Sequence, residues 1–319
     1  MKTFLKLPAK SAAAARRPHG IGPTLWSRFS ADRAALAAFV FIVSCVIEGL
    51  HAPLLPLADP VNIDLAHMFA APSPAHLFGA DHLGRDVLSR LVWGIRTTLF
   101  SAAAAMAATT LLGALWAAAA ASAGRRIDRL MMRIARAWMA LPAEVMILAV
   151  VGMLGPGLEN VIFACVAAKW PWHARMIRSA LARLANAGFI VFPKIAGAGS
   201  ASILLMHLIP NILGEFFVYA TIDTASVILT VATLSFLGLG VAAPAPEWGM
   251  MLAEAKNVMT IHPGLMLAPG LAILFTSAAF SFMGDGLASA LRPKEPGRIV
   301  PERTPAAQGS SPAPKGEMP

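Results

Sequence analysis

Charged residues are scarce in this chain. Only 13% of its 319 residues are charged and 57% are hydrophobic, whereas soluble domains carry about 25% charged residues. A soluble globular domain is therefore excluded for most of the sequence. Lipid is the expected solvent, with the apolar surface gathered in several long segments.

Cysteine, tyrosine and several catalytic motifs are also rare or missing. Cys45 and Cys165 are the only cysteines and both lie in apolar runs, which argues against a disulfide framework or a metal site. The single tyrosine and many alanines suit close packing of helices through small residues. The sequence has no G-x-x-x-x-G-K-[ST] loop, so ATP is expected to bind on another chain. It also lacks H-E-x-x-H and G-x-S-x-G motifs, so we do not expect an enzyme.

The net charge of +9 raises the possibility of nucleic-acid binding. The basic residues, however, cluster at the ends of apolar segments, where membrane orientation signals belong. Membrane topology explains the charge better. We therefore expect the chain to contact membrane lipid and not to bind nucleic acid.

Six apolar segments predict an all-α polytopic membrane protein. The first covers 34–50 and is read as an uncleaved helix, because no convincing cleavage site follows it. The other five fall between 97 and 292, at about 97–123, 137–154, 158–174, 208–240 and 265–291.

The arginine and lysine distribution predicts both termini in the cytoplasm. The basic tail 1–33, the linker 124–136 and the loop after the fourth segment would all lie inside. The loop 51–96 would lie outside although it carries Arg85, Arg90 and Arg96, because long loops weigh little in this rule. The tail 293–319 is rich in Pro, Ala, Gly and Ser and is predicted to be disordered.

An amphipathic pattern precedes the second segment. Its apolar residues recur at helical spacing, and taken locally they predict an interfacial helix leading into the membrane. They are Leu83, Val87, Leu88, Leu91 and Val92.

Four ordered motifs carry a resemblance that spans almost everything from His76 to Pro293. The first reads G-A-D-H-L-G-R-D-V-L-S-R-L from Gly79, and the second is the stretch from Gly124 to Pro142, where a basic loop is followed by L-P-A. The third reads S-F-L-G-L-G-V-A-A-P-A-P-E-W-G-M-M-L from Ser235, and the last joins P-G-L-A-I from Pro269 to G-D-G-L-A-S-A-L-R-P from Gly284. In this order they resemble the dipeptide, oligopeptide and nickel branch of ABC-importer permeases, of the subunit-C type. The matching signature residues are Gly84, Arg85, Asp86, Gly238, Gly240, Trp248, Gly249, Gly284 and Asp285.

The resemblance implies a type I (MetI-like) permease fold with six transmembrane helices in the bacterial inner membrane. It implies a heterodimer with a second permease subunit, two ATP-binding subunits and a periplasmic substrate-binding protein. No cofactor is expected on this chain, since ATP and magnesium would bind the partner subunits. No metal site is expected either, because the histidine spacings do not form one.

Such permeases carry a cytoplasmic coupling loop with the pattern E-A-A, three variable residues, Gly, then Pro. In the loop 183–207, Gly197 and the following Pro210 match, but Val191, Phe192 and Pro193 occupy the E-A-A positions. The resemblance still implies that this loop docks on an ATPase, the alternative being a plain solvated loop. The implied coupling residues are Phe192, Pro193, Lys194, Ile195, Ala196, Gly197, Ala198, Gly199, Ser200 and Pro210.

Asp223 is an acid in the middle of the fifth apolar segment. A carboxylate inside a membrane is costly and often functional. It is a candidate for the translocation pathway, where it would favour a cation, or it hydrogen-bonds a neighbouring helix. The sequence leaves both alternatives open.

The cargo is predicted from two segments, 151–162 and 169–180, which resemble nickel-type permeases more than dipeptide ones. Trp170 and Trp172 carry most of this impression. Nickel, free or chelated, is therefore the preferred cargo and short peptides the alternative. A secondary transporter is disfavoured because no inverted repeat or embedded coupling site is visible, and a membrane enzyme because no catalytic constellation is present.

Overall fold

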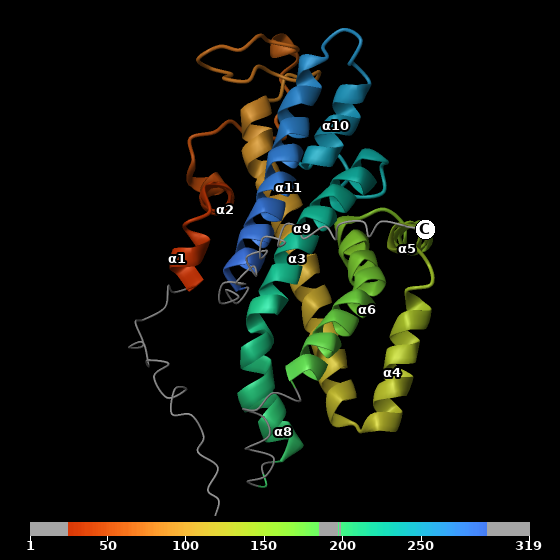
Figure 1. Ribbon diagram of the computed structural model, residues 1–319. Helices are drawn as coiled ribbons and strands as arrows, with labels where there is room; N and C mark the ends of the chain where they lie inside the picture. The colour runs from red at the N-terminus through yellow and green to blue at the C-terminus, as the bar shows by residue number, and fades with distance from the viewer. Residues whose placement is uncertain (1–24, 185–196, 198, 292–319) are drawn as a thin grey trace, which may run out of the picture.

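The computed structural model describes residues 25–184, 197 and 199–291 and contains no strand within them, apart from one isolated bridge between Ala80 and Asp86 (Figure 1). The all-α class predicted from the sequence is confirmed for this part of the chain. The helices are α1 (Leu25–Phe29), α2 (Arg33–His51), α3 (Val87–Ser122), α4 (Arg125–Trp138), α5 (Ala143–Leu154), α6 (Leu158–Leu184), α8 (Ser200–Ile203), α9 (Ile209–Phe236), α10 (Trp248–Lys256) and α11 (Gly264–Leu291). Short helical turns lie at η1 (Ala52–Leu54), η2 (Leu65–His67) and η3 (Leu204–Leu208).

Acidic side chains begin three of these helices. Asp32 accepts hydrogen bonds from two backbone N–H groups of α2, Asp86 from that of Ser89 in α3, and Glu247 from that of Met250 in α10. These bonds satisfy donors that have no partner within the helix. At the other end of α9, Gly238 takes a φ of +81° that favours glycine and terminates the helix.

Four described helices are long and apolar enough to cross a membrane: α2 with η1, α3, η3 with α9, and α11. A fifth span results if the bent pair α4 and α5 is counted as one. The segment predicted at 158–174 lies within α6, which carries charged residues such as Lys169 and Arg175 and is not among these helices. The count of six spans therefore stays a prediction.

Two predicted boundaries are wrong. The helix expected at 97–123 begins at Val87, because Asp86 caps it there, so Val87, Leu88, Leu91 and Val92 lie in the first turns of α3 rather than in a separate interfacial helix, and Leu83 precedes the helix. The span expected at 137–154 is broken between Trp138 and Ala143, where the two helices meet at 77°. Pro142 stands at the break and has no N–H to continue the earlier helix.

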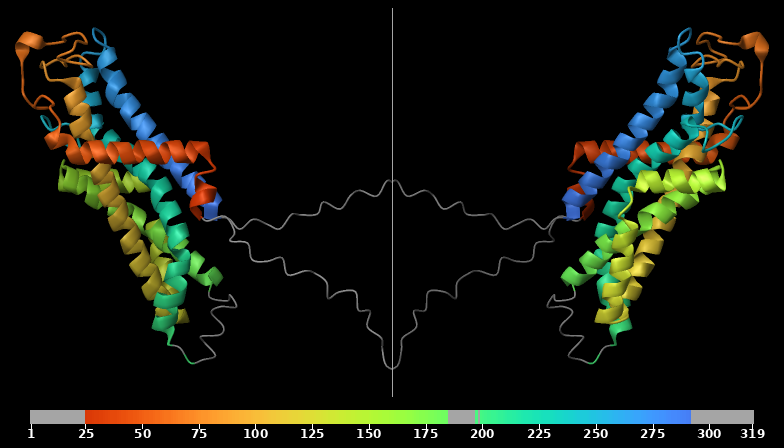
Figure 2. Two further views of the ribbon diagram at one scale, coloured as in Figure 1. Left: turned by 90° about the vertical axis from the view of Figure 1, so that its left-hand side faces the viewer. Right: turned by 90° about the vertical axis from the view of Figure 1, so that its right-hand side faces the viewer.

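The helices form an elongated bundle. Helix α3 packs along α6 and α9, and α11 packs along α9 and α2. Residues 52–86 and α10 lie at one end, called here the α10 end, and α8 with the start of α4 at the other, called the α8 end (Figure 1). Helix α2 crosses α11 steeply, as the turned views show (Figure 2).

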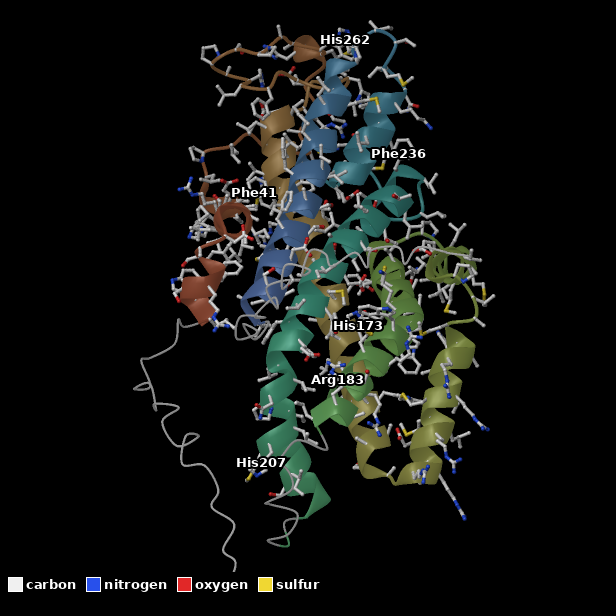
Figure 3. The ribbon with its side chains drawn as sticks, in the orientation of Figure 1. Phe41, His173, Arg183, His207, Phe236 and His262 are labelled. Atoms are coloured by element: carbon white, nitrogen blue, oxygen red, sulfur yellow. The ribbon has the colours of Figure 1, made fainter. Side chains whose placement is uncertain are left out.

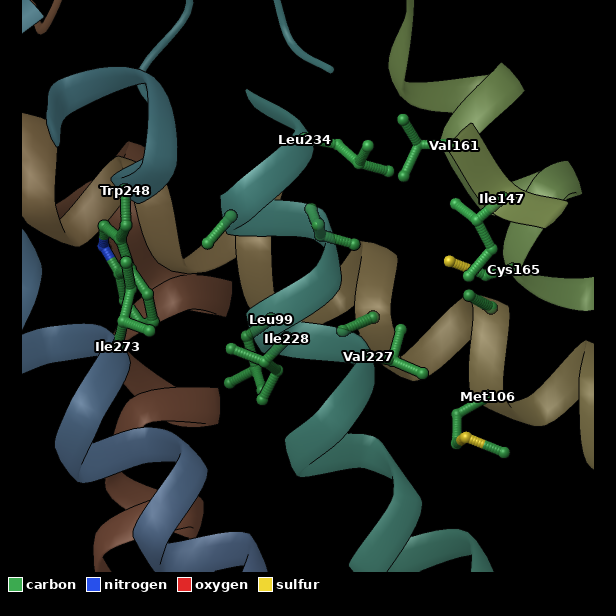
Figure 4. Close-up of a cluster of buried hydrophobic side chains, with 14 of the residues drawn as sticks. Leu99, Met106, Ile147, Val161, Cys165, Val227, Ile228, Leu234, Trp248 and Ile273 are labelled. Carbon is green, nitrogen blue, oxygen red and sulfur yellow. The ribbon is translucent and has the colours of Figure 1, made fainter. Parts of the chain in front are cut away.

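The main core gathers apolar side chains from α3, α5, α6, α9, α10 and α11 (Figure 4). Leu99, Ile147, Val161, Cys165 and Ile228 are each at most 1% exposed within it. Glycines let the backbones approach between these side chains, as small residues do in membrane bundles. A Cβ on Gly113 of α3 would lie 2.7 Å from the Cβ of His173 of α6.

Replacing Gly249 by alanine should destabilise the protein. Its Cβ would lie 2.1 Å from the carbonyl oxygen of Ala232, so α10 and α9 would have to separate, at a cost of roughly 1–3 kcal/mol. Gly270→Ala is the matched control, because the nearest atom to its added Cβ is 3.9 Å away. Thermal unfolding in detergent should show a lower midpoint for Gly249→Ala only; equal midpoints would contradict the close packing of α10 on α9.

Candidate functional site

A cluster of four charged side chains joins the start of α3 to α10. Arg85 donates from Nε to Asp81 Oδ2 at 2.8 Å and from Nη2 to Glu254 Oε2 at 2.8 Å. Arg90 donates from Nη1 to the same two oxygens, at 2.7 and 2.6 Å. Both arginines are at most 2% exposed. Two positive and two negative charges thus compensate each other in the α10 end.

Asp81 is ionised in this cluster. Burial acts to raise its pKa, but the N–H of Leu83 and the positive charges of Arg85 and Arg90 outweigh burial and lower the pKa below its usual value. The carboxylate therefore holds both arginines over the ordinary pH range. The segment 81–90 and α10 are fixed to each other as a result.

The signature residues of this segment have structural roles. Gly84 has a φ of +75°, and a Cβ there would lie 1.7 Å from the carbonyl oxygen of Asp64, so only glycine fits. Arg85 belongs to the charged cluster. Asp86 caps α3 and its Oδ1 lies 3.1 Å from Nδ1 of His76.

The motif that begins at Ser235 surrounds the turn from α9 to α10. Trp248 donates from Nε1 to the carbonyl oxygen of Leu91 at 3.0 Å and covers Gly94 of α3. Gly249 lies against Ala232, and Gly240 folds back onto Ser235. Together with Gly238, these residues dock α10 against α3 and α9.

The last signature lies on α11. A Cβ on Gly284 would lie 2.4 Å from Cγ1 of Ile222, so this glycine sets the approach of α11 to α9. Asp285 is exposed and has no hydrogen bond to any side chain in the described ranges. The structure brings the motifs that begin at Gly79 and Ser235 together and leaves Gly284 and Asp285 apart from them.

A second polar cluster lies between α6 and α9, the two helices that flank the predicted coupling loop. Lys169 donates from Nζ to Asp223 Oδ1 at 2.7 Å and to Ser226 Oγ at 3.1 Å. Nε2 of His173 lies 3.1 Å from the other carboxylate oxygen of Asp223. The three charged or titratable side chains are 10%, 18% and 1% exposed for Lys169, Asp223 and His173. We call these four residues the α6–α9 latch.

The hydrogen bonds that the sequence left open for Asp223 are present in the latch. The carboxylate binds side chains of a neighbouring helix, and its charge is balanced by Lys169. It is therefore not a lone negative charge in an apolar span. Its place on the translocation pathway stays a prediction.

A second ion pair joins the same helices closer to the loop. Arg183, near the end of α6, donates from Nη2 to Glu215 of α9. Figure 3 labels Arg183 and His173 on α6, which runs beside α9. The Arg183 pair is about half exposed, so it stabilises little by itself. It extends the connection between α6 and α9 toward the α8 end.

The coupling-loop residues are only partly described. Phe192, Pro193, Lys194, Ile195, Ala196 and Ala198 lie outside the described residues. Gly197 has a φ of +81° and its Cβ position is open. The carbonyl of Gly199 accepts from Ile203 N–H at 3.0 Å where α8 begins with Ser200, and Pro210 stands in the first turn of α9.

Both polar clusters lie in the part of the chain that matches a known protein family. A family model described as the binding-protein-dependent transport system inner membrane component matches residues 77–295. The chain belongs to this family. The resemblance drawn from the four motifs is therefore confirmed.

Curated relatives of this transport family cover most of the chain. The metal-staphylopine import system permease CntC of Staphylococcus aureus is 38% identical over 84% of this chain and 92% of its own length. The nickel transport system permease NikC of Escherichia coli is 38% identical over 74% and 85%. The dipeptide permease DppC of Alkalihalophilus pseudofirmus is 34% identical over 82% and 86%. The relatives are transport components, as expected, rather than enzymes.

Sequence reasoning missed most partners in both clusters of this inner membrane component. His173, for example, is buried against Asp223. One signal was available: Lys169 and His173 are four residues apart in an apolar helix and so share a face, and a buried charge requires a partner. Arg90 and Glu254 carried no comparable signal, because they are far apart in the chain. Within the described residues no group of three or more His, Cys, Asp or Glu forms a metal site.

Breaking the latch from one side should be more damaging than removing it. Asp223→Asn leaves the ammonium of Lys169 buried without a counter-charge, and removing one partner of a buried pair costs roughly 3–5 kcal/mol. The double variant Lys169→Met with Asp223→Leu removes both charges and should recover most of that loss. Thermal unfolding of the three purified proteins measures the difference. A double variant no more stable than Asp223→Asn would contradict the ion pair.

Proposed function

We propose that this chain is one permease subunit of an ATP-driven importer that carries nickel, free or chelated, across the bacterial inner membrane. The observation that carries the transport part is the family match over residues 77–295, which includes both polar clusters. The cargo part rests on the relatives, of which the two metal-import permeases are 38% identical and the dipeptide permease 34%. Short peptides are the second candidate cargo.

The proposed complex follows from the family description, which names a binding-protein-dependent transport system. This chain would pair with a second permease, and two ATP-binding subunits would supply ATP and magnesium. A periplasmic protein would deliver the cargo to the α10 end. Both termini and the loop between α6 and α8 would then lie on the cytoplasmic side.

The α6–α9 latch supports a mechanical role for the coupling loop. The loop connects α6 to α8 and, beyond it, to α9. Helices α6 and α9 are joined by the ion pair of Lys169 with Asp223 and by that of Arg183 with Glu215. A push on the loop would therefore move α6 and α9 together instead of bending one of them. Coupling needs an element whose contacts differ between two states, and this joined pair of helices is the proposed lever.

The same latch supports α6 as the sixth span. Helix α6 is not among the helices apolar enough to cross a membrane, and it carries Lys169 and three arginines. Asp223 compensates Lys169 from the neighbouring helix, which lowers the cost of placing that charge at membrane depth. With the segment predicted at 137–154, which holds α5 and the last residues of α4, as the remaining span, the predicted six spans would be complete.

Gly197 provides a test of the coupling loop. Because its φ is +81°, Gly197→Val would strain the backbone by roughly 1–3 kcal/mol and shift the loop. We expect the assembled transporter to keep ATP hydrolysis while cargo uptake falls about tenfold. Asn tolerates positive φ, so Gly197→Asn should transport almost normally.

Gly199 is the matched control for the loop. Its φ is not in the left-handed region and its Cβ position is open, so Gly199→Ala should keep uptake and hydrolysis coupled. Normal uptake by Gly197→Val at normal expression would sink the assignment of this loop as the coupling element.

Cargo identity is tested by uptake of radioactive nickel at trace concentration in cells with and without the gene. We expect deletion to abolish most gene-dependent uptake, and excess dipeptide not to compete. Restoring the gene should restore uptake, and Asp223→Asn should restore less. Unchanged nickel uptake together with lost dipeptide uptake would replace nickel by peptide and leave the permease assignment in place.

A further inference from the structure

Helix α4 presents three different faces. Its inner face packs on α3 and α6 through residues such as Ala135, which is 1% exposed and lies against Trp170 and Ala174. Asp128, also on this side, receives two hydrogen bonds from Arg178 of α6, both at 2.8 Å. The inner face is therefore fully used by the fold. The two outer faces are not.

One outer face is a row of arginines. All five are exposed, and at helical spacing they lie on one side of α4: Arg125, Arg126, Arg129, Arg133 and Arg136. The only acid on the helix is Asp128, and both of its oxygens are bound by Arg178. In the part of the chain that the structure describes, none of the five arginines has an ion pair. We call this face the arginine row.

The other outer face is apolar. It holds four large side chains, which follow one another at three- and four-residue spacing. Their exposed fractions are 51%, 57%, 44% and 43% for Ile127, Leu130, Ile134 and Trp138. Trp138 is held in place by its Nε1, which donates to the carbonyl oxygen of Ala167 at 2.8 Å. We call this face the apolar row.

We propose that α4 is a docking surface for anionic phospholipids. The arginine row binds the phosphate groups of the lipid heads, and the apolar row enters the adjoining acyl region, with Trp138 at the boundary. The charge complementarity is direct, because five unmatched guanidinium groups meet a negatively charged surface. A helix with separate cationic and apolar sides is the form that lies at a membrane interface.

A lipid explains both rows, whereas an acidic protein explains one. An acidic protein on the arginine row would leave four large apolar side chains of the same helix in water. The family is a membrane component, and α4 joins the apolar helix α5 directly at the 77° bend, so a bilayer is within reach. The inference rests on the membrane location of the family and is independent of the cargo.

Quenching of Trp138 fluorescence tests the proposal. The full-length protein is reconstituted in phosphatidylcholine vesicles that contain increasing amounts of brominated phosphatidylglycerol or, separately, brominated phosphatidylcholine. The difference between wild type and Trp138→Phe isolates the signal of Trp138. We expect brominated phosphatidylglycerol to quench Trp138 by half at about one third of the fraction that brominated phosphatidylcholine needs. This ratio, the preference for the anionic lipid, should fall in about 0.5 M salt.

Charge variants assign the preference to the arginine row. Arg129→Gln with Arg133→Gln should bring the preference close to one, and Arg129→Lys with Arg133→Lys should keep most of it. Arg96→Gln with Lys256→Gln is the matched control, because it removes two exposed charges elsewhere in the bundle. That control should leave the preference unchanged.

Three results would overturn the proposal. Equal quenching of wild type by the two brominated lipids would show that the head group does not matter. A preference that survives in the Gln pair would place the lipid elsewhere. Absence of quenching by either lipid would show that protein covers the apolar row. None of these results bears on nickel uptake or on Gly197.

Discussion

A charge inside a membrane protein must be compensated within the protein, because lipid supplies neither water nor counter-ions. The latch between α6 and α9 follows from this constraint. Lys169 alone would make α6 a poor membrane helix, and Asp223 alone would do the same to α9; their contact at 2.7 Å allows both to be buried together. This pair holds together the two helices on either side of the proposed coupling loop.

The two ends of the bundle are held in different ways. At the α10 end, four buried charges and several glycine contacts fix α3, α9 and α10 to one another. Toward the α8 end, Arg178 of α6 binds Asp128 of α4 through two hydrogen bonds, a buried apolar cluster joins α3, α6 and α9, and the ion pair between Arg183 and Glu215 is about half exposed.

Helix α4 shows how one segment serves both fold and surroundings. The carboxylate of Asp128 accepts two hydrogen bonds from Arg178, which connect α4 to α6. The arginines of α4 therefore have no acidic partner on their own helix. The break at Pro142 separates α4 from α5 and interrupts the apolar segment that the sequence predicts at 137–154. What looks in the sequence like a basic linker before a span is an amphipathic helix with a defined inner face.

The sequence by itself determined the all-α class, the apolar helices α2, α3, α9 and α11, and the family, because long apolar runs and ordered motifs are local in the chain. It also placed Asp223 and the glycines at Gly84, Gly249 and Gly284. Only the tertiary structure decided which side chains meet: Arg90 with Glu254, and Lys169 and His173 with Asp223. These contacts join residues from different helices, and their partners are set by helix packing, which no local pattern encodes.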